Sequence, residues 1–228
     1  MTKASKAGSA AIVVDRKNGS SARIAVAGLA MLITLLVGTA RNSTARRVPG
    51  TRSADLKMSV RVYNYAGIPP DMLGIAESEA ARIFANAGVH LEWQECPMTG
   101  RAESAGSTCA APPTPSELRL RILSRVKLMP IHATAETVGF TIGDLVTVQT
   151  EPLLDLRTQT ERFLPLMLGR AIAHEIGHAL LGGGHSSQGI MQAQWGPRQL
   201  EFAAANDMVF TPDQGRALRL AIKTRTGQ

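Results

Sequence analysis

Hydrophobic and polar positions alternate along several segments of the chain, a pattern typical of β-strands that bury one face. The segments with this pattern are 56–67, 89–95, 117–123 and 138–150, the last of them with a turn at Gly143–Asp144. In the first, Met58, Val60 and Val62 fall on one side. In the second, the alternation turns His90 to the polar side, where it is expected to face solvent.

Three other segments have the spacing of amphipathic helices: 71–87, 164–181 and 210–225. The first of these is expected to bury one face, formed by Met72, Ile75, Ala76, Ile83 and Phe84. Gly88 follows it as a C-cap, and Thr211 with Pro212 begins the last helix. Strand, helix and three strands followed by two helices predict an α+β domain over residues 56–228.

The first 55 residues are expected to lie outside that domain. Residues 1–23 form a basic leader, and 24–40 (IAVAGLAMLITLLVGTA) contain no charge. This apolar run fits the core of a signal peptide or a membrane anchor, with a buried core helix as the alternative. Residues 41–55 are polar and predict a linker. Both export interpretations place residues 41–228 outside the cytoplasm, in the periplasm, in the medium or at the membrane.

Charge excludes one class of partner. The chain has 25 Lys and Arg against 18 Asp and Glu, a net charge of +7. Five of the basic residues lie within residues 1–40, and the remainder carries only +3. Nucleic-acid binders concentrate basic charge on one face together with stacking aromatic residues, and aromatic residues make up 4% here. We therefore expect no nucleic-acid partner.

The two cysteines, Cys96 and Cys109, flank a small, polar segment. An oxidising compartment permits a disulfide that closes this loop, and two unlinked thiols are the alternative. Neither cysteine has the C-x-x-C spacing typical of metal sites.

The sequence HEIGH at residues 174–178 is a candidate metal site. Residues four apart on a helix lie one above the other, so His174 and His178 present two imidazoles to one cation. Glu175 lies one step round the helix, within reach of a metal-activated water but turned away from the metal. The pattern predicts two ligands and a general base on one rigid element.

Three glycines, Gly182–Gly184, follow this helix and predict a sharp exit from it. The exit can bring His185 back as a third ligand. Met191 follows six residues later, in the sequence GIM.

These features resemble the metzincin clan of zinc peptidases, which share the long HExxH helix, a glycine turn, a third histidine and a methionine turn. The chain is also similar to small exported bacterial proteins with HEIGH, HS and GIM motifs. The resemblance implies a small mixed sheet packed on a backing helix and an active-site helix. It also implies Zn²⁺ bound by His174, His178 and His185, with Met191 packed beneath. The chain departs from the pattern in having one residue more before His185 and Ala193 where some members have tyrosine.

The implied activity is metalloendopeptidase activity on a peptide or protein substrate, with Glu175 as general base. By the same resemblance, Leu145–Thr150 is expected to be the edge strand that pairs with an extended substrate. The inhibitory cysteine of a pro-segment is not expected, since Cys96 lies inside the predicted domain.

Several alternatives stay open. His174 and His178 could be a core pair, or the zinc could be purely structural. The third ligand could be Glu201, as in gluzincins, where a glutamate on a following helix completes the site. The domain could also be a non-catalytic zincin-fold binding module at the cell envelope, attached to the membrane through residues 24–40 if the leader is not cleaved.

Overall fold

A computed structural model of the chain describes residues 11–14, 56–97, 109–125, 137–154, 164–195 and 208–227. The expectations for residues 24–40 and 41–55 lie outside these ranges, as do those for Glu201. All statements about the fold below concern the described residues.

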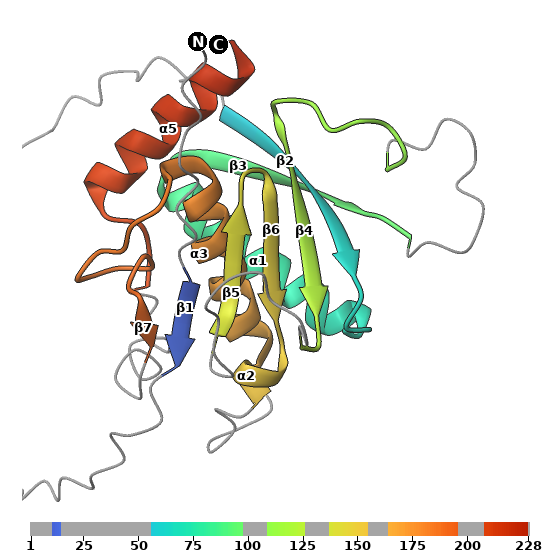
Figure 1. The fold of residues 1–228 in the computed structure, drawn as a ribbon. Coiled ribbons are helices and arrows are strands. Elements are labelled where there is room, and N and C mark those ends of the chain that lie inside the picture. The colour runs from blue at the N-terminus through green and yellow to red at the C-terminus, as the bar shows by residue number, and fades with distance from the viewer. Residues whose placement is uncertain are drawn as a thin grey trace, which may run out of the picture.

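A twisted mixed sheet forms one layer of the molecule (Figure 1). Its strands are β1 (Ala11–Val14), β2 (Leu56–Asn64), β3 (Val89–Glu95), β4 (Glu117–Leu123), β5 (Thr137–Ile142), β6 (Leu145–Gln149) and β7 (Gln194–Trp195). Their order is β3-β2-β4-β6-β5-β1-β7. Strands β3, β2, β4 and β6 are parallel to one another, and β5 returns antiparallel to β6.

The α+β class predicted from the sequence is confirmed. The helices are α1 (Pro70–Asn86), α2 (Glu151–Leu154), α3 (Leu164–Leu181) and α5 (Pro212–Thr226). Helices α1 and α3 lie side by side behind the sheet (Figure 1), with α1 against β3 and α3 against β5 and β6. The alternating strands bury Met58, Val60 and Val62 as expected.

The buried face of α1 is only partly the predicted one. Ala76, Ile83 and Phe84 are buried, but Ile75 is 48% exposed and Leu73 takes its place in the core. Helix α1 packs closely on α3, and this contact turns a different face of α1 into the core from the predicted one. A Cβ atom at Gly169 of α3 would lie 2.4 Å from the carbonyl oxygen of Ala76, so glycine is needed there.

The ends of the helices follow the sequence signals. Gly88 adopts a φ of 76° after α1, a left-handed conformation that favours glycine. Thr211 caps α5: its hydroxyl accepts from the Gln214 amide, and the Gln214 side chain accepts from the Thr211 amide. Leu218 and Ile222 of α5 are fully buried. This capping box fixes the start of the last helix against the core.

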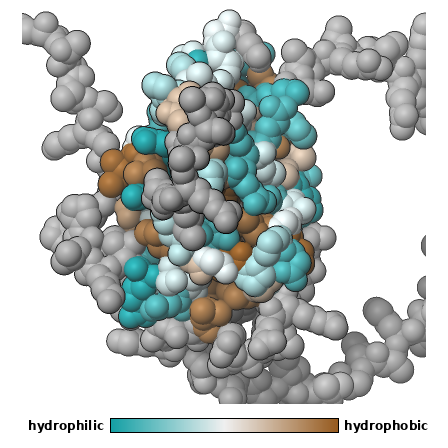
Figure 2. Space-filling model, turned by 90° about the vertical axis from the view of Figure 1, so that its right-hand side faces the viewer, coloured by the Kyte–Doolittle hydropathy of each residue, from teal (hydrophilic) through white to brown (hydrophobic). Residues whose placement is uncertain are grey.

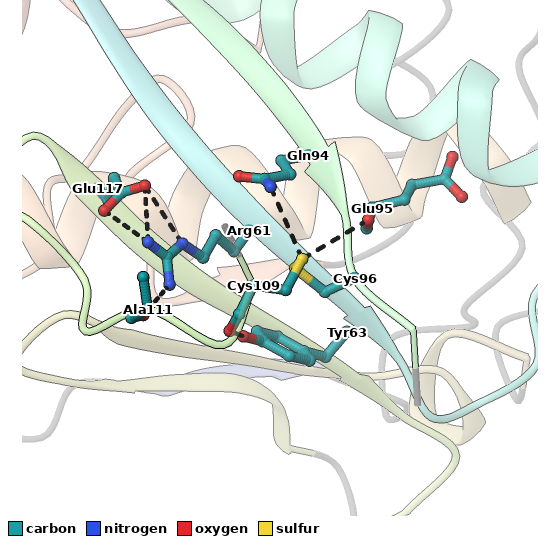
Figure 3. The surroundings of a disulfide bond; sticks show 8 residues. All are labelled: Arg61, Tyr63, Gln94, Glu95, Cys96, Cys109, Ala111 and Glu117. Atoms are coloured by element: carbon teal, nitrogen blue, oxygen red, sulfur yellow. Dashed lines mark hydrogen bonds and ion pairs between the residues drawn. A yellow bond between two sulfur atoms is a disulfide. The ribbon is translucent and has the colours of Figure 1, made fainter. Parts of the chain in front are cut away.

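Cys96 and Cys109 form the expected disulfide (Figure 3). Beside it, Arg61 of β2 is buried although it lies on a strand that alternates. Its guanidinium donates to both carboxylate oxygens of Glu117, the closer contacts being 2.9 Å, and to the carbonyl of Ala111 at 2.6 Å. The disulfide and the ion pair together hold residues 109–117 against β2.

The predicted edge strand is wrong. Residues 145–149 form β6, which is hydrogen-bonded to β4 on one side and to β5 on the other. A strand paired on both sides has no free main-chain groups for a peptide. Beyond β6 comes β5, whose other side is paired with β1.

None of the helices in the described ranges is long and apolar enough to cross a membrane. On the face shown in Figure 2, polar side chains are interspersed with apolar ones. Large exposed apolar residues of the described part are scattered over different elements: Tyr65, Ile75, Ile142 and Leu220. Scattered residues of this kind are normal for a protein surface.

Candidate metal centre

Helix α3 places His174 and His178 on one buried face, as the spacing predicts. Their side chains are 0% and 5% exposed, and their Nε2 atoms are 2.8 Å apart. The helix is rich in alanine, glycine and leucine and is buried along nearly its whole length. A buried helix holds both imidazoles on a rigid support.

The glycine turn brings His185 to the same point. Gly182 and Gly184 have φ values of 83° and 131°, which lie in the region that favours glycine. His185 Nε2 lies 3.3 Å from His178 Nε2, and the possible ligand atoms of all three histidines lie within 4.8 Å of one another. The extra residue before His185 is therefore absorbed by the turn, and the three histidines form a group that can hold a metal ion.

Backbone carbonyls fix which ring nitrogens face the group. His174 Nδ1 lies 2.7 Å from the carbonyl oxygen of Ile190, and His178 Nδ1 lies 3.3 Å from that of Gly182. A carbonyl oxygen only accepts, so both Nδ1 atoms carry the proton and both Nε2 atoms present a lone pair. Facing lone pairs at these distances repel unless a cation lies between them. The donor set therefore fits a metal ion.

The spacing and ligand type narrow the choice of metal. Among the described residues the group has three imidazoles and no fourth ligand, a set typical of zinc sites that keep one position open. Tetrahedral zinc separates two imidazole nitrogens by about 3.3 Å, so the pair in α3 has to open by about half an ångström. His185 is exposed, which leaves that side of the group accessible to solvent.

Burial keeps these histidines in the neutral form that binds metals. It lowers the pKa of His174 well below the ordinary value of 6.5, with a further contribution from His178. Burial also lowers the pKa of His178 to about 4, and that of His185 below the ordinary value. Protons therefore compete little for the three ligands near neutral pH.

Glu175 is fully buried against β5. Its side chain lies against Gly139, where a Cβ atom would be only 2.7 Å from Glu175 Cγ. Thr141 Oγ1 lies 2.9 Å from both Glu175 Oε2 and the Glu175 backbone oxygen. Burial raises the pKa of the carboxyl well above 4.5, although the Thr141 hydroxyl opposes the shift.

Met191 and Trp195 close the buried side of the group. Met191 is 2% exposed, and its Sδ would lie 2.6 Å from a Cβ atom at Gly177 in α3. The Trp195 ring lies edge-on to His174, with centroids 5.8 Å apart. Met191 therefore packs against the helix that carries His174 and His178, and Trp195 is fully buried.

The comparisons with solved structures identify the fold. Archaemetzincin from Methanopyrus kandleri aligns with a TM-score of 0.50 at 16% identity, over 75% of this chain and 98% of that chain. The chain has an archaemetzincin-like fold. A zinc-dependent peptidase from Methanocorpusculum labreanum aligns with a TM-score of 0.49 at 14% identity, over 70% of this chain and 99% of that one.

No protein-family model matches the sequence, and no curated protein matches it either. The archaemetzincin-like fold agrees with the zincin-type arrangement predicted from the HExxH helix.

The remaining histidine in the described residues does not join the group. His90 lies on β3 and is exposed, as predicted. Glu201 and His132 lie outside the described residues, so the alternative third ligand stays untested. Gly139 and Thr141 were not predicted as part of the site, since their contacts with Glu175 come from the position of β5 in the sheet.

Proposed function

We propose that the chain is a zinc-dependent peptidase, with zinc held by His174, His178 and His185. The observation that carries this proposal is the convergence of three imidazoles, two of which, His174 and His178, turn their Nε2 lone pairs towards each other. The archaemetzincin-like fold supports it, because the sequence motifs independently resemble those of the metzincin clan of zinc peptidases. The substrate class is peptide or protein.

Zinc at this position supplies Lewis-acid polarisation of a carbonyl oxygen and lowers the pKa of a water molecule towards neutrality. Glu175 is the group that moves the proton. A neighbouring divalent charge favours its carboxylate form, which can accept a proton from water and return it to the leaving amine. Thr141 and Gly139 hold the carboxyl in place while it does so.

The test compares Glu175→Gln with the wild-type full chain on denatured casein. Glu92→Gln is a matched control, because Glu92 is exposed on β3, at the far edge of the sheet from β5, the strand that packs on Glu175. We expect a chelator to stop hydrolysis and added zinc to restore it. Glu175→Gln should keep its zinc and lose about 100-fold or more in rate, the usual contribution of a positioned general base.

Two outcomes contradict the proposal in different ways. Retained hydrolysis by Glu175→Gln contradicts the role of this carboxyl. A wild-type chain that is silent with zinc fully bound favours the alternative, a zincin-fold binding module without catalysis.

We also propose that residues 41–228 act outside the cytoplasm. The Cys96–Cys109 disulfide supports this, because disulfides persist in oxidising compartments and are rare in the cytosol. Cysteine alkylation of freshly isolated protein, followed by mass spectrometry, tests it: blocked thiols at both positions would contradict an oxidised state in the cell.

A further inference from the structure

Strand β1 lies in a slot between two segments of the chain. On one side it pairs antiparallel with β5, where Ala11 lies opposite Phe140 and Ile12 opposite Gly139. On the other side it pairs parallel with β7, with Val14 opposite Trp195. The slot therefore offers main-chain partners to both edges of one extended strand.

Both walls of this slot belong to the candidate metal centre. Gly139 of β5 packs on the Glu175 side chain, and Trp195 of β7 lies edge-on to the His174 ring. Any strand that pairs with Gly139 and Trp195 thus crosses beside the group that would perform hydrolysis. This position differs from the predicted one, since β6 lies inside the sheet.

The present occupant comes from a remote part of the sequence. Val14 ends β1, and the next described strand begins at Leu56. Strand β1 is four residues long and has an irregular register between Ile12 and Val13, so few ladder bonds hold it. Main-chain pairing depends little on side chains, and another extended peptide can replace such a strand.

We propose that residues 11–14 act as an internal competitor, because in the intact chain they fill the slot between β5 and β7 in which an extended peptide substrate would pair. Residues 11–14 compete with a substrate for the slot, so the intact chain hydrolyses peptides more slowly than a chain whose slot is empty. A substrate that replaces β1 runs antiparallel to β5 and parallel to β7. The lowered activity of the intact chain rests on the proposed function, whereas the occupancy of the slot does not.

The proposal links activation to the fate of residues 1–40. Because β1 shares a sheet with the domain, both lie on the same side of any membrane. A single crossing by residues 24–40 would put residues 11–14 on the opposite side from the domain. Such a crossing, or cleavage after residue 40, therefore empties the slot.

The test uses the full chain with Ile12→Pro and Val13→Pro together. Neighbouring residues of a strand direct their N–H groups to opposite sides, so this pair removes one donor towards each wall. Ala4→Pro with Ser5→Pro, which precede β1, is the matched control. The probe is a fluorescent peptide with the sequence of residues 9–16 (SAAIVVDR), and binding is followed by anisotropy.

We expect the peptide to bind the Ile12→Pro/Val13→Pro chain at least about tenfold more tightly than the wild type or the control. The reason is that the apparent affinity equals the affinity of the empty slot multiplied by the fraction of chains whose slot is empty. Casein hydrolysis should rise by a similar factor. A second variant guards against misfolding: a site-specific protease sequence inserted after Gly50 allows the folded wild-type chain to be cut and its N-terminal fragment removed.

The two proposals fail separately. If the proline variant binds the peptide more tightly but no variant hydrolyses casein, the occupancy of the slot by residues 11–14 is supported and the peptidase function is contradicted. Equal peptide binding by the wild-type, proline and cut chains, or no binding by any of them, overturns the inference whether or not casein is hydrolysed.

Discussion

The hydroxyl of Thr141 lies 2.9 Å from two oxygen atoms of Glu175, one in the side-chain carboxyl and one in the backbone carbonyl. A protonated Glu175 can donate to Thr141 Oγ1 while Thr141 donates to the carbonyl, so each of these two contacts has its own proton. An ionised Glu175 competes with the carbonyl for one proton. Burial, which raises the pKa of Glu175, favours the first arrangement.

Thr141→Val keeps the shape of the side chain and removes the hydroxyl. We expect a loss of about 1–3 kcal/mol in the free energy of unfolding, the usual result of leaving a buried polar group without its partner. Hydrolysis should fall as well, because the carboxyl loses its positioning contact. Thr141→Ser should restore most of both quantities. Urea denaturation and the casein assay measure them, and a Thr141→Val chain as stable and active as the wild type would contradict this role.

Glu77, on α1, makes the free energy of unfolding depend on pH. Burial first, and then the charge of Glu95, raises its pKa from 4.5 to about 7. Its Oε1 is buried without a hydrogen-bond partner among the described residues. The folded state therefore holds a proton that the unfolded state loses. The resulting stability is full below pH 4.5 and is lost as the pH rises to about 7.

Glu77→Gln should remove this loss. Because Glu77 is about half buried, solvent screening limits the expected gain at pH 8 to about 1 kcal/mol. At pH 4.5 the variant should match the wild type. Urea denaturation at both pH values measures the difference, with the exposed Glu92→Gln as control. An equal gain at both pH values would show that ionisation of Glu77 is not the cause.

At the scale of elements, a buried ion pair joins the two helices behind the sheet. Glu79 of α1 accepts from Arg170 Nε of α3 at 2.9 Å, and from Arg82 at 2.7 Å. Burial alone would raise the pKa of Glu79, but the bonds from Arg82 and Arg170 lower it below 4.5. The pair sits near Gly169, where the helices approach most closely, and fixes the register of the helix that carries the histidines.

Glu79→Gln should therefore destabilise the fold by about 3–5 kcal/mol, since it removes the carboxylate charge that faces the buried Arg170 guanidinium. Breaking the exposed Lys57–Glu92 pair by Glu92→Gln should cost less than about 1 kcal/mol. Chemical denaturation of the two variants tests the contrast, and comparable losses would contradict it.

Secondary-structure elements could be predicted from the sequence where their ends and spacing depend on neighbouring residues. The bounds of α3 agree with the prediction, Gly88 follows α1, and Thr211 caps α5, because helix spacing and caps depend on neighbouring residues. The edge strand could not be predicted, since strand order depends on contacts between distant segments. Ile75 was placed in the core for the same reason: periodicity defines a face, and only the packing of α3 decides its rotation.

At the scale of the whole molecule, the candidate metal centre combines predictable and unpredictable parts. The histidines follow from spacing within one helix and one turn. Gly139, Thr141 and Trp195 come from strands that fold over that helix, and no local pattern marks them. The strand formed by residues 11–14 was not predicted either, because its four residues lie within a stretch interpreted as a leader.

The zinc content of the purified full chain tests the central claim most directly. We predict about one zinc ion per chain in the wild type and in His90→Ala, whose histidine is exposed on β3, and little zinc in His174→Ala and His185→Ala after dialysis. Metal analysis by mass spectrometry gives all four values in one measurement. Full zinc retention in both His174→Ala and His185→Ala would contradict a site built from these three histidines.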